Sequence, residues 1–186
     1  PTIIEAHTTA FGWSGPFSHR PGVDPLAQGW MGLQMAQAGH GNPPVFLASL
    51  APTDYTSGGL VALGAIMALY HREKTGVSQK VDCNLLNAGA LLRTDAFMQY
   101  EGVKPQRSAD KDQNGLSALH RLYETKRGWI YLIAEGDVKW KNFCAALGEK
   151  EITGNSQFET QSSREDNDQI LSKALENIFN RNEAEY

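Results

Sequence analysis

The sequence contains few cysteines and no long apolar run. Its two cysteines, Cys83 and Cys144, have neither the number nor the spacing of a disulfide framework or a zinc site, so we expect two small buried residues. The apolar run over residues 60–70 is far shorter than the roughly 20 residues of a membrane span, and no signal peptide is recognisable. We therefore expect a cytoplasmic protein with no membrane partner and no bound metal.

The sequence also lacks an excess of positive charge. Its net charge of -4 and pI of about 5.7 give no general affinity for nucleic acid. Neither a Gly-x-Ser-x-Gly motif nor a Walker A loop is present. A hydrophobic content of 41% and a charged content of 20% are typical of a globular protein, and 186 residues allow one large domain or parts of two.

Both ends of the sequence have the pattern of an element that is already under way. Residues 2–6 read as a strand, and residues 182–185 still read as a helix. We therefore expect a fragment of a longer protein.

Strand and helix patterns alternate in the first half of the chain. We expect strands at 3–10, 45–47 and 79–85 and helices at 26–35, 57–72 and 85–100, an order typical of an α/β layer. The composition changes over residues 101–114, which predicts a linker between domains 1–104 and 105–186. The second half predicts an α+β domain: a hairpin around 126–128, a helix capped by Asp137 and closed by Gly148, a capping box at 162–165, and an amphipathic helix over 170–179.

The stretch from Leu50 to Tyr70 combines one carboxylate, a pair of adjacent glycines and an apolar helix. With Ser57 as N-cap, Asp54 would lie in the turn before a helix that is apolar on every side and therefore buried. A partly desolvated carboxylate can act as a nucleophile. Gly58 and Gly59 would let a carbonyl approach the backbone, where helix-start N–H groups stabilise an oxyanion. An ordinary turn or capping aspartate fits the same residues, and the residues alone leave both readings open.

Two other segments also allow two interpretations. Residues 11–25 are rich in glycine and proline, which suits either an ordered loop that lines a site or a plain connector. Arg72, Lys74 and Gly76 suit a helix C-terminus better than a phosphate site, because cations and a closing glycine are typical of that position.

Several motifs in sequence order resemble those of the family III CoA-transferases, which include formyl-CoA transferase, carnitine CoA-transferase and the related α-methylacyl-CoA racemase. The resemblance covers nearly the whole chain. It rests on residues 15–29 (GPFSHRPGVDPLAQG), 54–59 (DYTSGG) with the apolar helix that follows, 72–76 (REKTG), 79–82 (QKVD), 123–125 (YET) and 128–130 (GWI).

The resemblance implies a Rossmann-like large domain, a small α+β domain and a homodimer of two interlaced chains. It implies that Asp54 attacks an acyl-CoA thioester, that CoA returns to form an aspartyl-CoA thioester, and that an acceptor carboxylate then takes the CoA. The substrates would be acyl-CoA and a small carboxylic acid, with no metal, ATP or other cofactor. Gly22, Val23 and Asp24, together with Gly58 and Gly59, would lie at the thioester end of CoA.

The sequence departs from the family in three places. Val23 stands where the racemase branch has a histidine base, which favours transfer over racemisation, with His19 as the one possible substitute. Only Asn114-Gly115-Leu116 matches the glycine run of formyl-CoA transferase, which disfavours formyl-CoA or oxalate as substrate. The family's N-terminal third, which supplies most CoA contacts, has no counterpart in residues 1–186. Acyl-CoA racemase activity and an inactive fragment or interaction module are therefore the alternatives.

Overall fold

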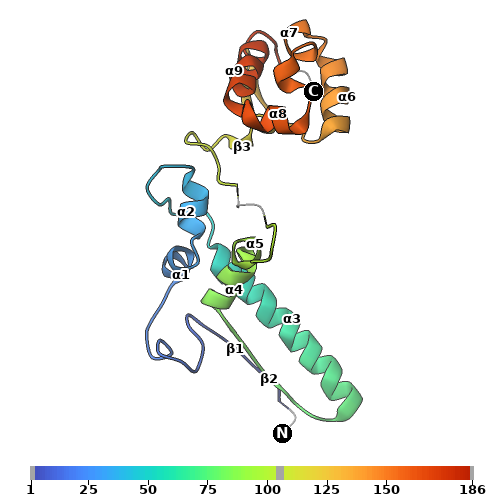
Figure 1. The fold of residues 1–186 in the computed structure, drawn as a ribbon. Helices are drawn as coiled ribbons and strands as arrows, with labels where there is room; N and C mark the ends of the chain where they lie inside the picture. Colours follow the sequence, from blue (N-terminus) through green and yellow to red (C-terminus); the bar gives the residue numbers. More distant parts are fainter. Residues whose placement is uncertain (1–2, 104–106, 185–186) are drawn as a thin grey trace. The chain divides into compact units, whose positions relative to one another are not determined.

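The protein is described here from a computed structural model, which covers residues 3–103 and 107–184. These residues fall into two compact units, one within 1–38 and 42–106 and the other within 39–41 and 107–186. The predicted domain boundary at residues 104 and 105 lies outside the described residues. Helices and strands occur in both units, which confirms the predicted α/β class (Figure 1). Among the described residues, no helix combines the length and apolar character needed to cross a bilayer.

The first unit is built around a pair of parallel strands, β1 (Glu5–Thr9) and β2 (Lys80–Asn84). Parallel neighbours need a crossover connection, and the connection includes the long helix α3 (Pro52–Thr75), which packs on both strands. Gly64 permits this packing, because a Cβ there would lie 2.5 Å from Val81 Cγ1. Among its described residues the unit also contains four shorter helices, of which the first and third pack on α3: α1 (Asp24–Trp30), α2 (Leu33–Ala38), α4 (Leu85–Leu92) and α5 (Thr94–Phe97).

Helix α3 starts earlier than predicted. It begins at Pro52, a residue favoured at the first helical position, and not after Ser57. Ser57 is instead a buried residue of the second turn, and its Oγ lies 2.5 Å from Thr8 Oγ1. The predicted C-terminus is confirmed: Gly76 adopts the left-handed conformation (φ 73°), and its N–H donates to the Arg72 carbonyl at 2.7 Å.

The prediction that α3 is buried on all sides is wrong for this chain. Only Thr53, Ser57 and Ala68 are buried, whereas Ile66 and Tyr70 are 64% and 66% exposed. The elements that pack on α3 in the first unit are β1, β2, α1 and α4. An apolar helix circumference indicates a helix that can be buried on every side, but the pattern does not show which residues cover that helix.

Three other predicted elements differ in their bounds. The helix expected at 26–35 is divided into α1 and α2 at Gly32, which has a φ of 72°. The helix expected at 85–100 is likewise divided into α4 and α5. Residues 45–47 form no strand, and residues 182–184 are not helical; residue 185 lies outside the described residues.

The second unit contains an antiparallel sheet in the order β3 (Gly115–Ser117), β4 (His120–Thr125) and β5 (Gly128–Ile133). The predicted hairpin is confirmed, since β4 and β5 pair from His120↔Ile133 to Thr125↔Gly128. The helices of this unit are α6 (Asp137–Leu147), α7 (Lys150–Thr153), α8 (Gln161–Asp166) and α9 (Asp168–Phe179), with a 3-10 turn η1 (Ser156–Phe158).

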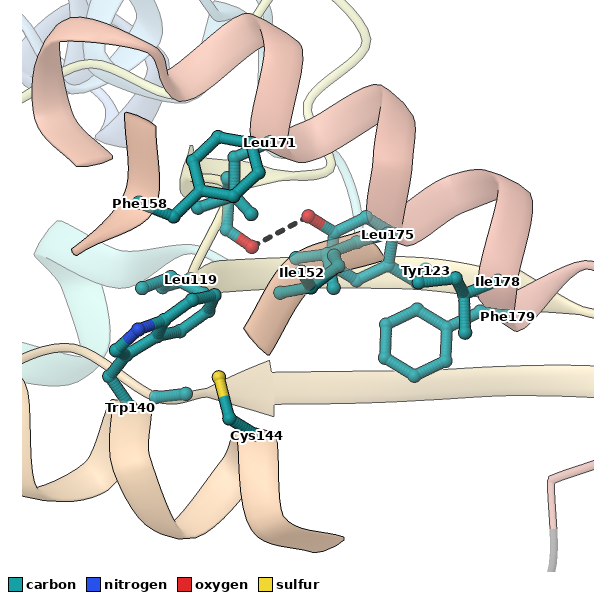
Figure 2. Close-up of a cluster of buried hydrophobic side chains, with 12 residues drawn as sticks. Leu119, Tyr123, Trp140, Cys144, Ile152, Phe158, Leu171, Leu175, Ile178 and Phe179 are labelled. Carbon is teal, nitrogen blue, oxygen red and sulfur yellow. Dashed lines mark hydrogen bonds between the residues drawn. The ribbon is translucent and has the colours of Figure 1, made fainter. Parts of the chain in front are cut away.

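A single apolar core holds the second unit together (Figure 2). Tyr123 of β4 lies in it with Leu171 and Leu175 of α9, and the Tyr123 hydroxyl donates to the Ala118 carbonyl at 2.6 Å. The predicted apolar face of α9 is confirmed for its buried members, although Ile170 is exposed.

Two predicted N-caps of the second unit are displaced along the chain. The capping box joins Thr160 and Ser163, one turn of helix α8, and not Ser162 and Glu165. Gly136, not Asp137, is the N-cap of α6, and Gly148 closes that helix as predicted. The carboxylate of Asp137 instead accepts a hydrogen bond from the buried Arg164 guanidinium at 2.5 Å.

Candidate functional site at the start of α3

Asp54 lies in the first turn of α3, not in a turn before the helix. Its side chain is exposed, so the dry, enclosed surroundings expected from the sequence are not found among the described residues. Within residues 3–103 and 107–184, its carboxylate has no hydrogen-bond or ion-pair partner. The pKa of Asp54 is raised above its usual value. The larger cause is desolvation by the protein atoms that cover part of the carboxylate, and the smaller cause is repulsion from the Asp24 carboxylate.

Asp24, at the start of α1, is only 3% exposed and joins its loop to the start of α3. Its Oδ1 accepts hydrogen bonds from the Thr53 N–H at 2.8 Å and from Thr53 Oγ1 at 2.6 Å. Its Oδ2 accepts a short hydrogen bond from Gln28 Nε2, and Thr53 and Gln28 are both fully buried. The structure therefore brings Asp24 next to Asp54, but as a buried, fully bonded group.

Val23 precedes Asp24 in extended backbone, and Gly22 lies against the residues that follow β1. A Cβ at Gly22 would lie 2.5 Å from the Ala10 Cβ and 2.9 Å from Phe11 Cε2, so a larger residue would displace the loop. Val23 is 63% exposed and points no ionisable group toward the site. Their proposed contacts with CoA stay predictions.

The rest of this loop is ordered by aromatic packing. The Phe17 ring contacts Trp30 of α1 edge-on, with ring centres 4.8 Å apart, and also contacts Phe11 at 5.9 Å. The Arg20 guanidinium lies 4.8 Å from the centre of the Phe17 ring. An ordered loop is one of the two alternatives that the sequence left open for residues 11–25. His19 in this loop is exposed.

Gly58 and Gly59 lie in the second turn of α3 and face open space, because a Cβ at either position would meet nothing within 4 Å. Gly58 is four residues after Asp54 and therefore on the same helix face. Their N–H groups belong to the internal ladder of the helix, and Asp24 takes the Thr53 N–H. Gly58 and Gly59 therefore lie beyond the start of the helix, and the oxyanion role expected of helix-start N–H groups stays a prediction.

A polar cluster in the second unit has no counterpart in the sequence-based predictions. Glu135 follows β5 and accepts a short hydrogen bond from Arg107, and its Oε2 lies 3.3 Å from His120 Nδ1. Desolvation opposes ionisation of Glu135, but the hydrogen bonds and charges of Arg107 and His120 prevail and lower its pKa. Arg107 and His120 lie 28 and 15 positions before Glu135 in the sequence, so no local motif marks the cluster.

No group of three or more potential metal ligands occurs among the residues that the structure describes. Cys83 and Cys144 are both free and buried, in agreement with the prediction for them. At the start of α3 the structure places a carboxylate beside an open helix surface.

Comparison with known proteins identifies the family. The model of CoA-transferase family III matches residues 1–186. The chain belongs to this family. Human succinyl-CoA:glutarate CoA-transferase is 31% identical over 180 residues, which are 96% of this chain and 41% of the human enzyme. Acetyl-CoA:oxalate CoA-transferase of Acetobacter aceti is 23% identical over 184 residues, or 99% of this chain and 47% of that enzyme.

Solved structures share the fold of this family III chain. A hypothetical protein of Mycobacterium tuberculosis superposes with a TM-score of 0.80 at 24% identity, covering 99% of this chain and 49% of its own. A CAIB/BAIF family protein of Brucella suis gives 0.80 at 24% identity, covering 98% and 48%. The chain thus spans less than half the length of these relatives.

Proposed function

We propose that a protein containing this chain is a CoA-transferase that moves coenzyme A between small carboxylic acids, with Asp54 as the nucleophile. The observation that carries the proposal is the carboxylate of Asp54, which lies unpaired among the described residues, at a helix start beside the bare backbone of Gly58. Membership of family III supports this role for the carboxylate. Relatives are named for glutarate and malate, so we propose small dicarboxylic acids other than oxalate as the first substrates to test.

The proposed reaction conserves the energy of the thioester. A carboxylate oxygen of Asp54 forms a bond to the thioester carbonyl carbon, and the C–S bond breaks with its electron pair on the CoA thiolate. The thiolate then attacks the Asp54 carbonyl of the anhydride, which releases the first acid and leaves an aspartyl-CoA thioester. The acceptor carboxylate attacks this thioester and forms a second anhydride, from which the thiolate takes the new acyl group. No redox step is needed, and the proposal includes no metal or further cofactor.

Both intermediates react with water, so the site must exclude it during turnover. Asp54 is exposed in this chain, and the proposal therefore requires that CoA or residues outside this chain cover it in the working enzyme. We propose a homodimer as that assembly and the cytoplasm as its location. Gly22, Val23 and Asp24 would lie near the thioester, where Gly58 and Gly59 leave space for it.

The test is to trap the aspartyl intermediate. Full-length protein is incubated with an acyl-CoA and hydroxylamine, and the peptide that contains Asp54 is analysed by mass spectrometry. We expect a hydroxamate on Asp54 and transfer of CoA to an added acid. Asp54→Asn should lose both, whereas Asp82→Asn, which removes a paired carboxylate on β2, should keep both. Full transfer activity in Asp54→Asn would refute the proposal.

The same reaction run in deuterated water with a 2-methylacyl-CoA tests racemisation. Removal of the α-proton needs a base on each face of the carbon, and Val23 supplies none at its position. We expect transfer without deuterium incorporation. Incorporation without transfer would instead favour a racemase.

A further inference from the structure

Asp24 is a buried carboxylate whose hydrogen-bond donors are all neutral. The Thr53 N–H, the Thr53 hydroxyl and the Gln28 amide donate to it, and no ion pair to it occurs among the described residues. Burying a charge without a countercharge is unfavourable. A neutral asparagine could accept the same bonds from Thr53, so packing alone does not account for the negative charge.

The hydrogen bonds of Asp24 fix the start of α3. The N-cap residue of α3, Ala51, makes no side-chain capping bond, so the first N–H groups of the helix need partners from elsewhere. Asp24 Oδ1 accepts the Thr53 N–H and thereby acts as a cap contributed by α1. Because Thr53 directly precedes Asp54, this contact also sets where the Asp54 backbone lies.

The charge of Asp24 acts on Asp54 as well. Repulsion from Asp24 raises the pKa of Asp54, in addition to desolvation. The other elements that pack on α3 are helix α4 and the two strands. Helix α4 has no ionisable side chain, and Arg93 follows it. The ionisable side chains of the strands are Glu5 and His7 on β1, and Lys80, Asp82 and Cys83 on β2. These side chains make contacts within their own strands, Glu5 with His7 and Lys80 with Asp82.

We propose that Asp24 is a positioning residue for Asp54, which holds the first turn of α3 in place and destabilises the ionised form of Asp54 relative to its acylated form. This inference rests on the proposed function. When Asp54 attacks a thioester, its negative charge leaves on the thiolate and Asp54 becomes a neutral anhydride. The covalent step removes the charge of Asp54, so the repulsion between the two carboxylates is released in that step. An interaction that is unfavourable only before the reaction raises the rate of that step.

The experiment measures the rate of hydroxamate formation on Asp54 against pH in full-length protein. Asp24→Asn keeps the shape and one acceptor oxygen but removes the charge. We expect the acid limb of its pH–rate profile to move to lower pH. We also expect the rate on the plateau to fall on the order of tenfold, which is less than the roughly hundredfold loss that a misplacement of about 1 Å can cause. A folded Asp24→Asn protein with an unmoved acid limb would overturn the proposal.

Two further variants separate charge from position. Thr53→Val removes the hydroxyl bond but leaves the Asp24 charge, so its rate should fall while its acid limb stays where it is. Asp82→Asn removes a carboxylate from β2 and should change neither quantity. A shift of the acid limb in Asp82→Asn as large as in Asp24→Asn would show a general charge effect and would also overturn the proposal.

A measurement on the unmutated chain covers the case in which Asp24→Asn does not fold. Carboxyl ¹³C NMR of the labelled chain follows the ionisation of Asp54 directly. We expect a midpoint above the ordinary aspartate value of about 3.9; a midpoint at or below it would refute the electrostatic part. Failure of the proposed function looks different, because no hydroxamate would then form on Asp54 at any pH.

Discussion

At the scale of single residues, Gly58 and Gly59 are costly for a helix and have no packing reason to be there. Glycine in an exposed helix interior is about 1 kcal/mol less favourable than alanine, and a Cβ at either position would meet nothing within 4 Å. We therefore expect Gly58→Ala and Gly59→Ala each to stabilise the chain by up to about 1 kcal/mol, measured by urea unfolding. Gly58→Ala should at the same time slow acylation of Asp54, because its methyl group occupies the same helix face.

Gly64→Ala is the matched control in the same helix. Its Cβ would lie 2.5 Å from Val81 Cγ1, so this change should destabilise the chain. If Gly58→Ala destabilised the chain as Gly64→Ala does, the space beside Asp54 would not be open. If it stabilised the chain without slowing acylation, the open space would not serve the reaction.

Sequence reasoning selected Asp54 and its two glycines, but it could not supply their surroundings. The pattern of residues 50–59 marks a carboxylate at a helix start, and the structure has one there. Its neighbour Asp24 comes from 30 positions earlier, and the Thr53 bond that joins the two segments depends on tertiary packing. The exposure of Asp54 could not be predicted from the sequence for the same reason, because burial depends on which elements cover a residue.

At the scale of elements, Glu135 lies in the connection between β5 and α6 and binds Arg107 and His120 through its carboxylate. The pKa of Glu135 is lowered in the folded chain by Arg107 and His120, so its ionised form stabilises the fold. This contribution is present above the unfolded pKa, near 4.5, and is lost as the pH falls through the folded value. We expect Glu135→Gln to unfold at lower urea concentration at neutral pH, and its stability to fall less on acidification.

The measurement is the urea midpoint of the second unit, followed by tryptophan fluorescence, as the pH is lowered from neutral. Glu124→Gln is the control, because Glu124 is an exposed carboxylate of β4. Parallel pH curves for Glu135→Gln and the parent chain would show that the Arg107 contact contributes nothing to stability.

Elements of the second unit were predicted more closely than those of the first, for a local reason. The hairpin turn at Gly128 and the helix end at Gly148 are specified by residues inside the element, and both predictions are confirmed. The start of α3 has two local candidates, Pro52 and Ser57. Asp24, a residue of another helix, caps the first of them. A local pattern could not choose between the two.

At the scale of the whole chain, the two units differ in how much apolar volume they bury. The buried apolar residues described in the first unit are Ala27, Ala38, Ala68, Cys83, Leu85 and Ala88. The core of the second unit instead contains large side chains such as Tyr123, Phe158 and Leu175 (Figure 2). Stability from burial grows with apolar area, so the second unit holds the larger share of the chain's stability.

Amide hydrogen exchange of the 186-residue chain tests this difference. We expect the slowest exchange in β4 and α9, which contribute Tyr123, Leu171 and Leu175 to the core, and faster exchange in α3, whose apolar residues are largely exposed. Leu175→Ala should speed exchange in both slow elements, because losing a buried leucine costs about 2–5 kcal/mol. Ile170→Ala, in the same helix but half exposed, should leave it nearly unchanged. Slower exchange in α3 than in α9 would mean that the exposed face of α3 is covered in solution, and the stability of the first unit would then come from that cover.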